Sequence, residues 1–189
     1  MHRHLPLCLS VLLLIAFRVI GAAYPMALPN FQPLAALFFC GSLIAPAWRG
    51  FALPLGIWIL TFPLGSGHPD GPSLFLTTLA ALTLTFFLGK WLSKKGWASM
   101  LLGSVAATLV FHLITNSAAW LADPRYAKSL VGLWQSLWTG APGDVLPSWV
   151  FLRNLGVANL IFTGAHLLAM LRAPQVYPSL AAPQAAKSH

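Results

Sequence analysis

One apolar stretch of the chain carries polar side chains at a spacing that could build a binding site. Ser104, Thr108, His112, Asn116 and Trp120 recur every four residues, and residues four apart lie on one face of a helix. Such a stripe is costly in a bilayer unless it faces other helices or a water-filled cavity. The neighbouring elements must therefore form an interior around it.

The composition is that of an integral membrane protein. Of 189 residues, 58% are hydrophobic and only 7% are charged, whereas soluble domains carry roughly 25% charged residues. The net charge of +8 does not indicate nucleic-acid binding, because the basic residues do not gather in a polar domain; membrane topology explains them better. Cys8 and Cys40 lie in separate apolar runs and fit small buried residues.

The apolar runs predict an all-α fold, a polytopic bundle of six transmembrane helices that forms one membrane domain over residues 1–172. The predicted spans are 5–23, 33–48, 51–67, 73–89, 98–121 and 148–171. The second and third are close to the lower length limit for a crossing, about 17 residues. The Pro- and Ala-rich segment 173–189 is predicted to be a flexible tail.

The first span has a competing interpretation. His2-Arg3-His4, the apolar run and Gly21-Ala22-Ala23 are also typical of a cleaved secretory signal peptide. Arg18 falls late in the run and further apolar spans follow at once, so a retained span is favoured.

The long connection, residues 122–147, also has a pattern of its own. Leu130, Trp134, Leu137 and Trp138 fall on one helical face, which predicts an amphipathic helix in the membrane interface.

Charge predicts the orientation. Six spans put both termini on one side, and the basic residues of that side, with no acid among them, are Arg3, Arg49, Lys90, Lys94, Lys95, Arg172 and Lys187. All three acids, Asp70, Asp123 and Asp144, fall on the other side. The positive-inside rule then predicts a multi-pass protein of the cell inner membrane with cytoplasmic termini.

This orientation gathers polar residues in the outward half of the bundle. The predicted substrate-binding residues are His112, Asn116, Trp120, Asn30, Arg153, Asn154 and Arg18. Ligand pockets combine mostly apolar walls with a few placed polar groups, so a small-molecule site open to the outside is expected, with membrane lipid around the bundle.

Each of these residues has a structural alternative. Arg18 and Arg153 are close enough to span ends to reach the lipid headgroups, or they could pair with Asp123 or Asp144. His112 lies too deep for that, so its alternative is an interhelical hydrogen bond. The outward tryptophans form either an aromatic belt or a lid over the pocket.

Several chemistries are excluded. The sequence has no paired carboxylates within a span and no H-E-x-x-H, G-x-S-x-G or P-loop motif, so neither an enzyme nor a cofactor is expected. Without a nucleotide site, uptake would need rocking of the bundle or a partner ATPase module. The hypothesis from another class is a non-transporting assembly or regulatory subunit whose polar stripe packs against another membrane protein.

Three segments resemble one family. PNFQPLAALF at 29–38, LITNSAAW at 113–120 and PSWVFLRN at 147–154 are similar to motifs of small uncharacterised bacterial membrane proteins to which a transport role is ascribed. The resemblance covers about residues 18–165. One departure is Thr61-Phe62, where that family often has Ser-Asp, so no role of that acid carries over.

The size, the six spans and the outward pocket are also similar to the substrate-binding S components of energy-coupling-factor vitamin transporters and to the related solitary cobalamin transporters. This likeness implies an S-component-like fold, uptake of a small vitamin-like molecule (cobalamin or another vitamin) and an energising ATPase module as partner. Cys40 is mid-span and does not match the cobalt-ligating cysteine of the cobalamin proteins. His68, in a polar loop, is the alternative cobalt ligand, and otherwise a solvated turn residue.

Overall fold

The computed structural model describes residues 5–24, 26–27, 29–45, 48–65 and 72–171. Within these ranges every regular element is helical. The helices are α1 (Leu5–Ala23), α2 (Leu34–Phe39), α3 (Gly41–Ile44), α4 (Arg49–Gly65), α5 (Pro72–Leu92), α6 (Trp97–Ala122), α7 (Leu130–Trp138) and α8 (Ser148–Leu171). The all-α prediction is confirmed, whereas the predicted tail, 173–189, lies outside the described residues.

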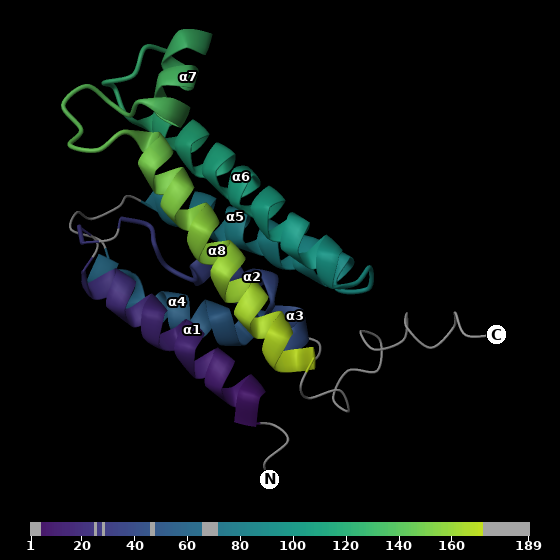
Figure 1. Ribbon diagram of the computed structural model, residues 1–189. Helices are drawn as coiled ribbons and strands as arrows, with labels where there is room; N and C mark the ends of the chain where they lie inside the picture. Colours follow the sequence, from purple (N-terminus) through teal and green to yellow (C-terminus); the bar gives the residue numbers. More distant parts are fainter. Residues whose placement is uncertain (1–4, 25, 28, 46–47, 66–71, 172–189) are drawn as a thin grey trace.

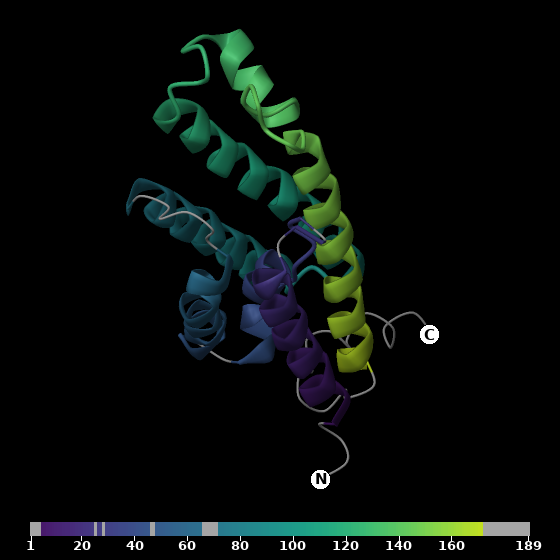
Figure 2. The same cartoon turned by 90° about the vertical axis from the view of Figure 1, so that its left-hand side faces the viewer.

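The long helices run side by side (Figure 1). Helix α6 packs against α5 and α8, and α1 packs against α4 and α8. A short turn joins α5 to α6 at one end of the bundle, and α7 lies at the opposite end, beside the last turns of α6 and the first turns of α8 (Figure 2). The bundle therefore has two distinct ends.

Among the described residues, three helices are long and apolar enough to cross a membrane. They are Leu74–Leu92, Trp97–Ala122 and Ser148–Leu171, while the described apolar parts of α1 and α4, Cys8–Ala23 and Arg49–Phe62, are shorter. Crossing a hydrocarbon core of about 30 Å takes about 20 helical residues. The membrane character of the chain thus rests on α5, α6 and α8.

The predicted second span, 33–48, is not one continuous helix. It forms the two short helices α2 and α3, which are interrupted at Cys40. Every residue of α2 is buried, and residues 29–33 lead directly into it (Figure 1). A run buried among helices is as apolar as one facing lipid, so the sequence pattern cannot distinguish them.

Close backbone contact holds α2 against α5. A Cβ atom added at Gly89 would overlap the carbonyl oxygen of Phe39. Small residues allow this approach between helices in membranes. The position of α2, and of the segment before it, therefore depends on the missing side chain at Gly89.

We predict that Gly89→Ala lowers the free energy of unfolding by at least about 1–3 kcal/mol, the usual effect of overpacking, because a backbone atom cannot move aside as a side chain can. The matched control is Gly56→Ala in α4, where an added Cβ meets nothing within 4 Å. Thermal unfolding in detergent measures both variants. Equal melting temperatures for the two would contradict the contact.

Candidate binding site at the Arg18 cavity

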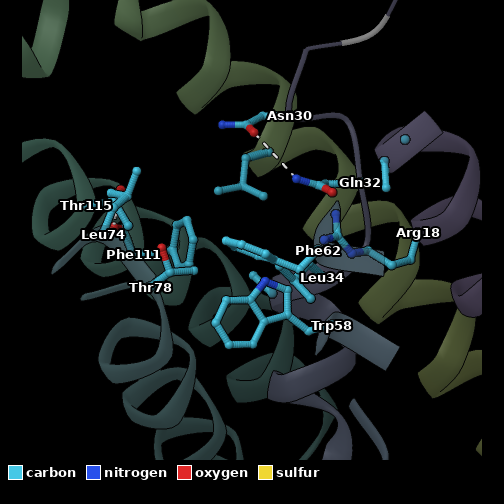
Figure 3. Close-up of a pocket in the computed structure, with 14 residues that line it drawn as sticks. Arg18, Asn30, Gln32, Leu34, Trp58, Phe62, Leu74, Thr78, Phe111 and Thr115 are labelled. Atoms are coloured by element: carbon cyan, nitrogen blue, oxygen red, sulfur yellow. Dashed lines mark hydrogen bonds between the residues drawn. The ribbon is translucent and has the colours of Figure 1, made fainter. Parts of the chain in front are cut away.

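A cavity of about 270 Å³ lies between α1, α2, α4, α5, α6 and α8. We call it the Arg18 cavity (Figure 3). Its lining residues are Arg18, Gly21, Ala22, Asn30, Gln32, Leu34, Ala35, Trp58, Phe62, Leu74, Thr78, Phe111, Thr115 and Leu155. A mostly apolar wall with a few polar groups is typical of small-molecule sites.

Arg18 is the cation of this cavity and is only 4% exposed. Leu14 and Ala22, four residues before and after it on α1, are also buried, so α1 turns this face toward the bundle. The guanidinium Nε has no hydrogen-bond partner. The two acids that the structure describes, Asp123 and Asp144, both pair with Arg125. Arg18 is therefore buried within the protein and pairs with no described acid.

Two amide side chains from the segment before α2 line the cavity: Gln32 lies beside Arg18, and Asn30 lies beyond Gln32 (Figure 3). Asn30 has φ 57°, a left-handed conformation that asparagine tolerates better than most residues. Gln32 Nε2 donates to Asn30 Oδ1 at 3.5 Å, and its Oε1 is buried without a partner. The cavity thus presents an unused acceptor as well as an unused donor.

Aromatic side chains form the apolar wall. Trp58 is buried and stacks on Phe75, with ring centroids 4.8 Å apart, and it meets the edge of Phe62 at 5.6 Å. Phe111 and Thr115 lie one turn apart on α6, on the side of the cavity opposite Arg18 (Figure 3). Rings fixed in this way offer a rigid apolar surface to a ligand.

The cavity occupies one half of the bundle. Arg18 lies near the end of α1, Thr78 near the start of α5 and Leu155 in the first third of α8. Toward the other end, Leu14, Leu37 and Phe162 belong to a buried apolar cluster, followed by a second one around Phe39 and Met100. The space beyond the cavity is therefore closed by packed side chains.

Two buried polar pairs lie deeper in the bundle. Ser10 Oγ is 3.2 Å from His166 Nδ1, and Asn159 Nδ2 donates to Thr108 Oγ1 at 2.7 Å. His166 Nε2 and Asn159 Oδ1 have no partner. These pairs join α8 to α1 and α6 below the cavity.

Of the predicted site residues, Arg18 and Asn30 line the cavity, whereas His112, Asn116 and Trp120 do not. His112 Nε2 lies 2.9 Å from the carbonyl oxygen of Leu137 in α7. Asn116 Nδ2 lies 3.0 Å from His112 Nδ1, and the Trp120 ring nitrogen donates to the Ala127 carbonyl at 2.8 Å. His112 and Trp120 thus hold the 122–147 connection against α6, and Asn116 bonds to His112 within α6.

Arg153 and Asn154 are outside the cavity as well. Arg153 is exposed; it donates to Asn154 Oδ1 at 3.2 Å and lies over the Trp149 ring. Asn154 Nδ2 donates to the Pro29 carbonyl at 2.9 Å. Asn154 therefore fixes the backbone next to Asn30 and acts on the cavity as a positioning residue.

The remaining candidates lie elsewhere. Trp134 and Trp138 stack on each other 6.2 Å apart on the exposed face of α7, where Trp134 is 65% exposed. Neither lines the cavity, so the geometry gives no lid formed by these rings. His68 lies outside the described residues, and among the described residues no three His, Cys, Asp or Glu side chains gather as a metal site.

Sequence reasoning missed most of the wall: Gln32, Trp58, Phe62, Thr78, Phe111 and Thr115. Gln32 carried a usable signal, because it is an uncharged polar residue two positions from Asn30 between Pro29 and Pro33. The aromatic residues carried no such signal, since the same residue types face lipid and line cavities.

The connection above α6 is also held by charge. Arg125 pairs with Asp123 at 2.7 Å and with Asp144 at 2.8 Å. The hydrogen bonds from Arg125 lower the pKa of Asp123 below its ordinary value. Lys128 Nζ donates to the carbonyl oxygens of Trp120 and Asp123.

The fold and the cavity define the class of the protein: within the described residues, an all-helical chain with membrane-length apolar helices and a largely apolar cavity that holds a buried arginine. More narrowly, the chain belongs to a family of unknown function, DUF6580, which matches residues 1–180. No curated protein and no solved structure matches the chain.

We predict that His112→Ala loosens the packing of α7 against α6 and leaves the lining of the Arg18 cavity unchanged. Loss of the bond to Leu137 leaves a part-buried carbonyl unpaired, a cost of about 1–3 kcal/mol, so hydrogen exchange of the α7 amides should rise. Leu113→Ala, an exposed neighbour on α6, is the control and should leave α7 exchange unchanged. Unchanged exchange in His112→Ala would show that the bond is dispensable.

Low pH should weaken the ion pairs of Arg125 with Asp123 and Asp144 in the 122–147 connection. Because the folded pKa of Asp123 is lowered, its contribution to stability is present above the unfolded value of about 3.9 and is lost as pH falls through the folded pKa. The melting temperature of Arg125→Gln should be below that of the wild type at pH 6, and the difference should vanish toward pH 2. A difference that is constant with pH would rule out this linkage.

Proposed function

We propose that this chain is a multi-pass inner-membrane protein that binds a small, semi-polar, vitamin-like molecule in the Arg18 cavity and takes part in its uptake. The observation that carries the proposal is a cavity of about 270 Å³ with a buried arginine in a largely apolar wall. Intramembrane ionisable residues are functional candidates because burying them without a partner is costly.

The basic residues support an outward-facing cavity. Lys90, Lys94 and Lys95 lie at or beside the α5–α6 turn and Arg49 begins α4, at the end of the bundle away from the cavity. By the positive-inside rule this charge distribution favours a cytoplasmic position for that end. With the short helices α2 and α3 counted as one traverse, the number of traverses is even, which favours cytoplasmic termini.

The cavity volume bears on the ligand. About 270 Å³ is just below the range of roughly 300–1,000 Å³ that drug-sized ligands occupy. A corrin ring with its side groups is far larger, so the volume favours a compact vitamin-like molecule over cobalamin. If the chain resembles S components of vitamin transporters, the expected ligand is therefore one of the smaller vitamins.

Release to the cytoplasm would require movement. The apolar clusters below the cavity, around Leu37 and around Met100, close it on that side, and well-packed cores do not open without rearrangement. The sequence has no nucleotide-binding motif, so rocking of the bundle or a partner ATPase module must provide the inward step.

The test is native mass spectrometry of the protein released from nanodiscs, which detects a co-purified small molecule. The wild type is compared with a variant whose cavity is filled by a larger side chain. Thr78→Phe places a ring in the cavity and should abolish binding of the co-purified molecule. Thr83→Phe, on the same helix but away from the lining, is the matched control and should retain it. Uptake of that molecule, isotopically labelled, by cells that express each variant should follow binding.

Melting temperatures separate a filled cavity from a misfolded protein. Loss of the bound molecule in both threonine variants, or its retention in Thr78→Phe, would place binding elsewhere. If the wild type retains no molecule and cells expressing it show no uptake, the proposal fails and the assembly or regulatory subunit becomes the leading hypothesis.

A further inference from the structure

We infer that the ligand of the Arg18 cavity is a small flat carboxylic acid that also carries an N–H or O–H donor. This inference rests on the proposed function and specifies its ligand by the chemistry of the lining residues. Three features of the cavity lead to it: one unsatisfied cation, one unsatisfied acceptor and a rigid aromatic wall.

The cation requires a single negative charge. Among the described residues that line the cavity, Arg18 is the one charged group, and its Nε lacks a partner. A buried charge without a partner strongly destabilises a fold, so an anion is the expected complement. The planar guanidinium matches a carboxylate in a two-point contact. A phosphate monoester, with a charge of about −1.5 to −2, would be left partly uncompensated.

The acceptor requires a donor on the same ligand. Gln32 Nε2 is engaged by Asn30 Oδ1, which fixes the amide with Oε1 as its free atom, and that atom is buried. Asn30 is itself held by the Asn154 bond to Pro29. Because Gln32 and Arg18 lie next to each other in the cavity (Figure 3), the donor must be close to the carboxylate.

The wall requires a flat body. Trp58 is immobilised by an edge contact with Phe62 and a stacking contact with Phe75. Phe111 lies across the cavity from Arg18 (Figure 3). Fixed rings bind other rings well by stacked or edge-on contacts. With about 270 Å³ available, a molecule of one or two rings is the size that fits.

Compact probes test each feature separately. Ligand-observed NMR titration of the wild type in nanodiscs compares benzoate with benzamide, phenyl phosphate, cyclohexanecarboxylate and 3-hydroxybenzoate. Benzoate should bind at least about tenfold more tightly than benzamide, since charged hydrogen bonds are roughly twice as strong as neutral ones. Benzoate should likewise bind more tightly than phenyl phosphate, because Arg18 leaves part of the larger phosphate charge uncompensated. It should also bind more tightly than the non-planar ring. The hydroxyl of 3-hydroxybenzoate should add about two- to tenfold, as one net hydrogen bond does.

Variants assign these preferences to residues. Arg18→Gln should remove the preference for benzoate over benzamide, and Arg18→Lys should keep part of it, because the charge remains without the planar fork. Gln32→Leu should remove the gain from the hydroxyl while leaving benzoate affinity within about twofold, less than one net hydrogen bond. Arg49→Gln, at an exposed arginine that begins α4 and lies outside the cavity, should bind every probe as the wild type does.

Native mass spectrometry of the same wild-type preparation distinguishes failure of the carboxylate assignment from failure of the proposed function. A bound molecule that is neutral, cationic or a phosphate would overturn the carboxylate assignment while leaving the proposed function in place. Benzamide binding equal to benzoate in the wild type would do the same. A wild type that retains no molecule and binds no probe would overturn both.

Discussion

The structure depends on the burial of α2 inside the bundle. The Phe39 carbonyl lies where a side chain of Gly89 would be, and every residue of α2 is buried. In hydrocarbon, backbone outside regular helices is tolerated only where protein or a water-filled cavity surrounds it. Residues 29–33, which are half-buried or buried, meet that condition, whereas Tyr24 and Met26 are exposed. The amides of Asn30 and Gln32 are consequently presented inside the bundle, at the depth of Arg18.

The same constraint accounts for the buried charge. A transmembrane arginine near a helix end normally extends to the headgroups, but α1 turns the Arg18 face toward α4 and α8. The inserted segment then provides polar neighbours in place of water. Asn154 extends this arrangement to α8 through its bond to Pro29. The polar side of the cavity is thus assembled from three separate parts of the chain.

The sequence allowed the helices to be predicted well and the site only in part. Residues 5–23 and 148–171 were predicted with the bounds that α1 and α8 have, because charged, Pro and Gly residues mark their ends. The break at Cys40 was missed, since α2 and α3 are as apolar as a true span. Arg18 and Asn30 were identified as polar residues of the correct half. Whether an arginine turns inward depends on the packing of α1, which periodicity alone does not reveal.

The α6 stripe shows most clearly why the rest could not be predicted. Thr108, His112 and Asn116 do face protein, as a polar stripe must, but they contact α8, α7 and each other. The cavity is lined instead by Phe111 and Thr115, one residue earlier in each turn and so about 100° around the helix. Helix α6 therefore turns two faces toward other parts of the protein, and only one is polar enough to stand out in the sequence. The conspicuous face braces the 122–147 connection, and the inconspicuous one faces Arg18 across the cavity (Figure 3).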